Sequence, residues 1–143
     1  MTTSVIDASV AIKWYTPEED RAPAMKLLAR AKSGEMAFHI PDLMYCEVGN
    51  ILWKKVRFGE LRDSEAGEIA AALLAVPKTV HPSALLFPAA LKAACLLGRP
   101  IYDCIYLALA EFLGSTLITA DKRLFNALAG TEWRHAVVLI QAV

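Results

Sequence analysis

Short, continuous apolar runs alternate along the chain with longer segments in which apolar positions recur at helical spacing. Runs of this kind predict strands that are buried on both faces, and apolar positions three and four apart predict helices with one buried side. The predicted strands span residues 3–6, 36–40, 78–81, 115–119 and 136–140. The predicted helices span residues 8–14, 18–31, 43–58, 63–76, 83–97, 103–112 and 121–128.

Aspartates and a proline mark several of the predicted helix ends. Asp42, Asp63 and Asp103 stand where a side-chain oxygen accepts a hydrogen bond from the first helical turn, so each is predicted to be an N-cap. Pro88 is predicted to mark the place where the regular part of its helix begins, since proline is best tolerated in a first turn. The helix at 18–31 has acidic residues first and basic residues last, which suits the helix dipole.

The alternation of strands with single helices or helix pairs predicts an α/β fold. Helical connections make successive strands parallel and cover the sheet on both faces. No internal repeat, low-complexity tract or linker interrupts the pattern. The sequence therefore predicts one domain over residues 1–143, with a central parallel sheet flanked by helices.

The composition is unusually apolar, and the charges cancel. Hydrophobic residues make up 56% of the chain and the mean hydropathy is +0.39, so part of the apolar surface is expected to be covered by a partner or a second copy. Lys and Arg number 15, as do Asp and Glu. This balance weakens the case for broad, non-specific binding to nucleic acid but leaves room for a local basic patch.

The sequence predicts neither a membrane protein nor a secreted one. The best apolar run, residues 104–110, is too short to span a bilayer, and the N-terminus lacks a basic segment followed by an apolar one. Three cysteines without ligand-like spacing fit a reducing cytosol, so a cytoplasmic location is expected. Cys46, Cys95 and Cys104 are interpreted as packing residues.

Four acidic residues lie in apolar surroundings, where an unpaired carboxylate costs on the order of several kcal/mol unless it is neutralised or bound to a cation. They are Asp7, Glu47, Asp103 and Asp121. Asp7 and Asp121 directly follow predicted strands, and open α/β sheets bind ligands beyond the carboxyl ends of their strands. Asp103 opens a helix at the same edge, and Glu47 lies on the inward side of its helix. One shared metal site would explain all four.

Each acid also has a purely structural interpretation. Asp7, Asp103 and Asp121 could be helix N-caps, and a cap leaves one carboxylate oxygen free for a metal. Glu47 has no capping role, so its alternative is a buried ion pair with a lysine or arginine. These alternatives stay open for each acid taken alone.

A site built only from carboxylate oxygens selects hard cations. Mg²⁺ and Mn²⁺ fit such a set, whereas zinc would favour histidine or thiolate. His39, His81 and His135 are scattered and are interpreted as structural or surface residues. A divalent cation held by few carboxylates keeps open positions, which suits phosphate chemistry.

The four acids, in this order and with their neighbours, resemble the PIN-domain nucleases, and most closely the small VapC-like toxins of prokaryotic toxin–antitoxin pairs. The resemblance spans residue 3 to about residue 140. It is carried by residues 5–9 (VIDAS), 47–50 (EVGN), 102–110 (YDCIYLALA) and 117–124 (LITADKRL).

The resemblance implies a PIN-like three-layer sandwich that cleaves RNA with Mg²⁺ or Mn²⁺ held by the four acids. The matching polar positions, Ser9, Asn50 and Thr119, would orient the carboxylates or their waters. Apart from the family, Ser9 could cap a helix and Thr119 could be an ordinary strand residue. The family also implies a homodimer and a cognate VapB-like antitoxin.

Other functions remain as alternatives. A non-catalytic RNA- or protein-binding module on the same fold would be indicated by loss of acids, and none is lost. A phosphatase of the haloacid-dehalogenase type would want a second aspartate where Ser9 stands. The candidates for contact with phosphate are Lys13, Lys54, Lys55, Arg57, Arg99, Lys122 and Arg123. Trp14, Trp53 and Phe58 are either interface residues or ordinary core.

Overall fold

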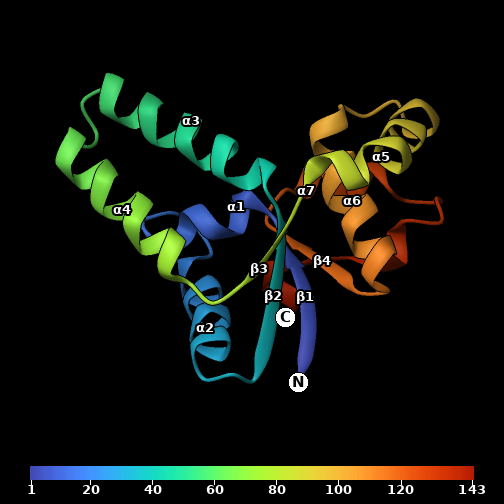
Figure 1. Ribbon diagram of the computed structural model, residues 1–143, viewed down its shortest axis with the longest axis horizontal. Coiled ribbons are helices and arrows are strands. Elements are labelled where there is room, and N and C mark those ends of the chain that lie inside the picture. The colour runs from blue at the N-terminus through green and yellow to red at the C-terminus, as the bar shows by residue number, and fades with distance from the viewer.

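Five short strands lie parallel in one sheet, in the order β3-β2-β1-β4-β5, in the computed structural model, which describes residues 1–143 (Figure 1). The predicted α/β fold with a parallel sheet is confirmed. The strands are β1 (Thr2–Ile6), β2 (Met36–Pro41), β3 (Thr79–His81), β4 (Thr116–Thr119) and β5 (Val137–Leu139). The α-helices are α1 (Ala8–Ala11), α2 (Arg21–Lys32), α3 (Leu43–Arg57), α4 (Asp63–Ala75), α5 (Ser83–Leu97), α6 (Ile101–Leu113) and α7 (Lys122–Ala127).

Helices cover both faces of the sheet, which makes the three layers that the sequence predicted. On one face, α6 packs against β1, β2 and β4. On the other, α2 packs on β2, and the Trp14 ring stacks on Phe38 of β2 with the ring centroids 5.7 Å apart. Because both faces are covered, the inner strands carry apolar residues in succession, as in the buried run from Leu117 to Ile118.

Helix α6 lies at the centre of the hydrophobic core. Residues 104–110 are all buried, and a helix that is apolar all round must be enclosed by its neighbours. The helix ends at Gly114, which adopts a left-handed conformation with φ of 62°. This firm placement matters for the site, because Asp103 lies in the first turn of α6.

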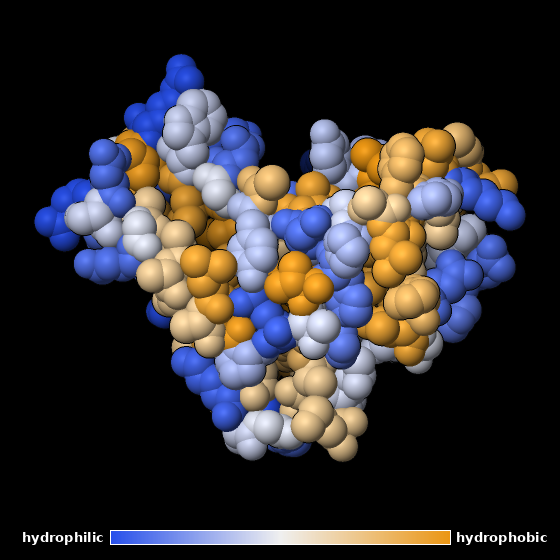
Figure 2. All heavy atoms as spheres, viewed as in Figure 1, coloured by the Kyte–Doolittle hydropathy of each residue, from blue (hydrophilic) through white to orange (hydrophobic).

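Helices α3 and α4 lie side by side and form an arm that extends away from the sheet, on the opposite side from α5 and α6 (Figure 1). The arm is shallowly anchored, since only Met44, Val48 and Leu52 of α3 and Leu73 of α4 are buried. The molecular surface is hollowed between this arm and the α5–α6 lobe (Figure 2).

The predicted roles of several residues at helix ends were wrong in whole or in part, for local physical reasons. Asp42 is the N-cap residue of α3, as predicted, but its side chain makes no cap hydrogen bond, because its carboxylate instead accepts hydrogen bonds from the backbone N–H and hydroxyl of Ser83 at the start of α5. Asp63 is the first residue of α4, whose N-cap is Arg62. Pro88 lies inside α5, which runs on both sides of it.

Two further boundaries shift the interpretation of charged residues. Helix α2 begins at Arg21, so the acidic residues at 18–20 precede the helix and do not lie in its first turn. Asp103 is inside α6, whose N-cap is Pro100, so the capping interpretation of Asp103 is wrong.

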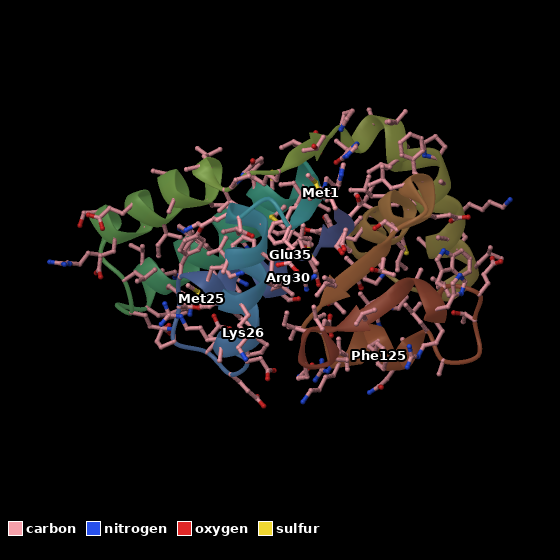
Figure 3. All side chains as sticks on the ribbon, turned by 90° about the horizontal axis from the view of Figure 1, so that it is seen from below. Met1, Met25, Lys26, Arg30, Glu35 and Phe125 are labelled. Atoms are coloured by element: carbon pink, nitrogen blue, oxygen red, sulfur yellow. The ribbon has the colours of Figure 1, made fainter.

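Side-chain contacts hold two of the connections between elements. Arg30 Nε lies 3.1 Å from the Glu35 carboxylate and closes the turn between α2 and β2 (Figure 3). The Arg134 guanidinium lies 3.5 Å from the Phe125 ring centroid and ties the segment before β5 to α7.

No single helix is long and apolar enough to cross a membrane, although α5 and α6, which meet at 118°, reach that length and hydropathy when taken together.

Two glycines are predicted to respond in opposite ways to replacement by alanine. Gly114 has positive φ, so Gly114→Ala should lower the free energy of unfolding by about 1–2 kcal/mol. Gly67 is exposed within α4 with open space around its Cα, so Gly67→Ala should raise the free energy of unfolding by about 0.5–1 kcal/mol. Urea denaturation of both variants beside the wild type measures the two changes. Shifts of the same sign would contradict the assigned backbone conformations.

Candidate active site

Asp7 lies at the carboxyl end of β1, beside the end of β4. Ile6 pairs with Ile118, so the chain brings Asp7 and Thr119 to matching positions on neighbouring strands. Asp7 Oδ2 accepts hydrogen bonds from Ser9 Oγ at 2.8 Å and from Thr119 Oγ1 at 2.6 Å. Ser9 Oγ in turn accepts a hydrogen bond from the backbone N–H of Ala120. Ser9 and Thr119 therefore fix the orientation of this carboxylate.

The Asp7 carboxylate does not stabilise the start of a helix. Asp7 is at the N-cap position of α1, but its side chain makes no cap hydrogen bond. Burial raises the pKa of Asp7, the hydrogen bonds from Thr119 and Ser9 lower it, and the charges of Asp103 and Asp121 raise it. The net direction is upward, so ionised Asp7 is destabilised by its surroundings.

Glu47 projects from α3 and receives a hydrogen bond from Tyr106 of α6, with 2.6 Å between Tyr106 Oη and Glu47 Oε1. No lysine or arginine forms an ion pair with it, so the interpretation as half of a buried ion pair is wrong. Burial raises the pKa of Glu47 to about 7, the Tyr106 hydrogen bond opposes the rise, and the charges of Asp7 and Asp103 add to it.

Asp103 forms an ion pair with Arg99, whose Nη2 lies 2.9 Å from Asp103 Oδ2. Arg99 lies in the turn between α5 and α6, four residues before Asp103. Its Nε atom is buried and has no hydrogen-bond partner.

Cys104, beside Asp103, is not a nucleophile. Burial, and to a smaller extent the charge of Asp103, raises the pKa of the Cys104 thiol to about 11, so the thiol stays protonated at neutral pH.

Asp121 is the N-cap of α7, which confirms the structural interpretation that the sequence left open. Its Oδ1 accepts hydrogen bonds from the backbone N–H groups of Arg123 and Leu124 at 2.9 and 3.1 Å. The backbone N–H of Asp121 donates to Thr119 Oγ1, which couples this residue to the network around Asp7. The cap uses one carboxylate oxygen and leaves Oδ2 without a hydrogen bond.

The four carboxylates share one arrangement. Each has one oxygen held by hydrogen bonds or an ion pair and a second oxygen without a protein partner, and none of these second oxygens is fully buried. The charges of Asp103 and Asp121 raise the pKa of Asp7, and those of Asp7 and Asp103 raise the pKa of Glu47, so Asp7 lies within electrostatic reach of the other three acids. A cation among them would relieve that repulsion.

The donor set therefore fits a hard divalent cation in its chemistry. Accessible carboxylate oxygens are the ligands that Mg²⁺ and Mn²⁺ take, and no imidazole or thiol shares the cluster. As the side chains stand, no three of them are close enough to hold one ion together. Joint binding would require the carboxylates to draw inward, or waters to bridge part of the distance.

The other predicted residues have mixed outcomes. Asn50 is exposed on α3 and makes no side-chain hydrogen bond to any of the carboxylates. Lys13 is buried and donates to the backbone oxygen of Glu19, so it is unsuited to contact phosphate. Lys55 pairs with Glu60, and Arg57 lies over the Trp53 ring. Lys54, Lys122 and Arg123 form no ion pairs.

Aromatic and histidine residues are divided between core and surface. Trp14 is core, and its Nε1 donates to the backbone oxygen of Ala24, whereas Trp53 and Phe58 are exposed. His39 and His81 are hydrogen bonded to each other between β2 and β3 at 2.9 Å, away from the acids. They are structural, as predicted.

The sequence did not predict that Tyr106 donates a hydrogen bond to Glu47, and it indicated Arg99 only as a candidate for contact with phosphate, not as the partner of Asp103. A signal for Tyr106 was available, because it stands three residues after Asp103 and so lies on the same side of α6. No local pattern could show that its hydroxyl meets Glu47, which is 59 residues away along the chain.

Comparison with known proteins identifies the family. The PIN domain model matches residues 4–130. A Pyrobaculum aerophilum protein named Ribonuclease VapC3 is 37% identical over 122 residues, which cover 84% of this chain and 90% of that protein. The chain is thus homologous to a VapC ribonuclease.

Solved structures agree with this assignment. A crystal structure of a protein from Pyrobaculum aerophilum superposes with a TM-score of 0.72 at 25% identity, covering 98% of this chain and 92% of that one. A toxin–antitoxin complex from Klebsiella pneumoniae contains a chain that matches with a TM-score of 0.63 at 13% identity, covering 98% and 99%, which supports the fold. With its parallel sheet, its family match and its homologue, the chain belongs to the PIN-domain family.

Proposed function

We propose that this chain is a metal-dependent endoribonuclease of the VapC type, the toxin of a VapBC-type toxin–antitoxin pair, which hydrolyses RNA phosphodiester bonds in the cytoplasm. One observation carries the proposal. Asp7 lies within electrostatic reach of Glu47, Asp103 and Asp121, and each of the four carboxylates has an oxygen without a protein partner, in a chain homologous to a VapC ribonuclease.

The cofactor would be Mg²⁺ or Mn²⁺, held by Asp7, Glu47, Asp103 and Asp121. Such a cation, when bound, activates a water molecule and stabilises the oxyanions of an in-line displacement at phosphorus. The all-oxygen donor set and the repulsion within it support this choice.

The residues would have different roles at the metal site. Asp7 and Asp103 would be the principal ligands, with Asp7 kept in one orientation by Ser9 and Thr119. Glu47 and Asp121 would complete the site directly or through waters. Asn50, three residues from Glu47 on α3, would orient a water molecule or a carboxylate at the site.

The partners would be RNA, a VapB-like antitoxin and a second copy of the chain. Structures of toxin–antitoxin complexes share this fold, which supports an antitoxin partner.

Exposed apolar residues gather over the α5–α6 lobe (Figure 2). Those of α5 are Leu85, Phe87, Leu91 and Leu96. A face of this kind supports a homodimer formed through α5, because monomers rarely leave large apolar patches in water.

Replacement of Asp7 by asparagine is predicted to abolish RNA cleavage. Asp7→Asn preserves the size of the side chain and the hydrogen bonds from Ser9 and Thr119 but removes the charge. The rate of cleavage of a fluorescent RNA with Mn²⁺ should fall by more than about 100-fold. Asp63→Asn, at an exposed acid of α4, is the matched control and should cleave at the wild-type rate.

Equal cleavage by Asp7→Asn and the wild type would refute the assignment of the site. If the wild type binds RNA but does not cleave it with either metal, the non-catalytic RNA-binding module becomes the better description.

The metal-free protein is predicted to lose stability as the pH rises through neutrality. The folded-state pKa of Glu47, about 7, lies above its ordinary value of 4.5, and that of Asp7 is also raised. The folded protein therefore holds more protons than the unfolded chain between those values, and the free energy of unfolding falls as pH increases across them. Thermal unfolding in chelator from about pH 5 to about pH 8 should show a declining Tm.

Glu47→Gln removes one titrating group and should flatten this decline, while the exposed Glu68→Gln should leave it unchanged. Added Mn²⁺ should raise the wild-type Tm more at the upper end of this pH range, where the ligands are ionised. A Tm that rises steadily with pH in chelator would contradict the assigned pKa shifts.

The free chain is predicted to be a dimer that a charge on α5 disrupts. Leu96 and Leu74 are each 65% exposed, the first on α5 and the second on α4 of the arm. Leu96→Glu should convert the dimer to monomer in light scattering coupled to gel filtration, since burying an unpaired carboxylate is costly. Leu74→Glu is the control and should stay dimeric. The reverse outcome would move the interface to the arm.

A further inference from the structure

The Tyr106 side chain is buried in the core yet reaches a candidate metal ligand with its hydroxyl. The residue is 2% exposed, and its O–H donates to Glu47 Oε1 at 2.6 Å. Burial, first of all, and then the charges of Asp7 and Glu47 raise the pKa of Tyr106 well above its ordinary value. The phenol therefore keeps its proton at neutral pH, and it lies close to both carboxylates.

The hydrogen bond links two helices, α3 and α6, that both pack on β2 but otherwise have different neighbours. Helix α6 packs on α5 and on β1, β2 and β4, whereas α3 packs on α1, β2 and α4. The Tyr106–Glu47 bond is the one side-chain hydrogen bond between α3 and α6. It ties a carboxylate on the shallowly anchored arm to the most deeply buried helix of the fold.

One side of α6 therefore sets the position of two of the four acids, Asp103 and Glu47. Asp103 and Tyr106 are three residues apart and lie on the same side of the helix. Asp103 is presented by the helix itself, and Glu47 is held by the Tyr106 hydroxyl. The bond engages Oε1 and leaves Oε2 without a partner.

We infer that Tyr106 is a positioning residue, which holds Glu47 with Oε2 free to bind a divalent cation and thereby sets the affinity of the site for that cation. This inference rests on the proposed function. Groups that orient a metal ligand through a hydrogen bond commonly change metal affinity or activity by about 10–100-fold when they are removed.

A purely structural role is the competing explanation, since a buried hydroxyl needs a hydrogen-bond partner in any case. That role predicts a change in stability without a change in cation affinity. It also predicts that any effect of removing the hydroxyl on cation binding is the same with and without the Glu47 carboxylate. The two explanations are separated by measuring cation binding in a double-mutant cycle.

Tyr106→Phe keeps the buried ring and removes only the hydroxyl. The dissociation constant for Mn²⁺, measured by calorimetry on the RNA-free protein, should rise by about 10–100-fold. In a Glu47→Gln background the same change should alter that constant by less than about twofold, because the carboxylate it orients is absent. Tyr15→Phe, at a half-buried tyrosine with no side-chain hydrogen bond, is the control and should bind Mn²⁺ like the wild type.

A second variant keeps the test decisive should Tyr106→Phe fail to fold. Glu47→Asp retains the charge but withdraws the carboxylate by one methylene from the Tyr106 hydroxyl, so it should weaken Mn²⁺ binding to a similar extent. If folded Tyr106→Phe binds Mn²⁺ as tightly as the wild type, or weakens binding equally with and without the Glu47 carboxylate, the inference is overturned. A wild type that binds no Mn²⁺ and cleaves no RNA would overturn the proposed function together with it.

Discussion

Negative charge held at close range is the constraint on which the rest of this structure depends. Asp7 and Glu47 have raised pKa values because they are buried and because other carboxylates lie nearby. A chain free to rearrange would separate such groups into water. Here each carboxylate is restrained through one oxygen, by hydroxyls at Asp7, by Tyr106 at Glu47, by Arg99 at Asp103 and by backbone N–H groups at Asp121. The restraints differ in chemistry, but all leave one oxygen available.

The parallel sheet and α6 are what make those restraints possible. The pairing of Ile6 with Ile118 sets Asp7 beside Thr119, so a one-residue slip between β1 and β4 would remove the Thr119 hydrogen bond. The buried segment 104–110 fixes the rotation of α6 and therefore the direction in which Asp103 and Tyr106 point. The apolar core thus offsets the electrostatic cost of the site and also determines its geometry.

The sequence predicts the strands and the parallel sheet well, because these depend on apolar runs. It also singles out the four acids as a candidate site, because they are carboxylates in apolar surroundings. It predicts the roles of residues at helix ends less well. Asp42 is at the predicted N-cap position, but its carboxylate bonds Ser83 on another helix, and Pro88 lies in a helix whose packing overrides its local preference. Tyr106, the partner of Glu47, lies 59 residues away from it, and Thr119, one of the two partners of Asp7, lies 112 residues away, and no local propensity encodes such contacts. Arg99 could be recognised only as a cation near an acid, not as the residue paired with Asp103.

The four acids are not held equally firmly, and this difference bears on how the site works. Asp7, Asp103 and Asp121 lie on the sheet edge or on helices that join it, whereas Glu47 lies on an arm with few buried residues. Arm motion would therefore displace Glu47 relative to the other three, and regions with little burial open at low free-energy cost. The Tyr106 bond opposes that displacement from the core side.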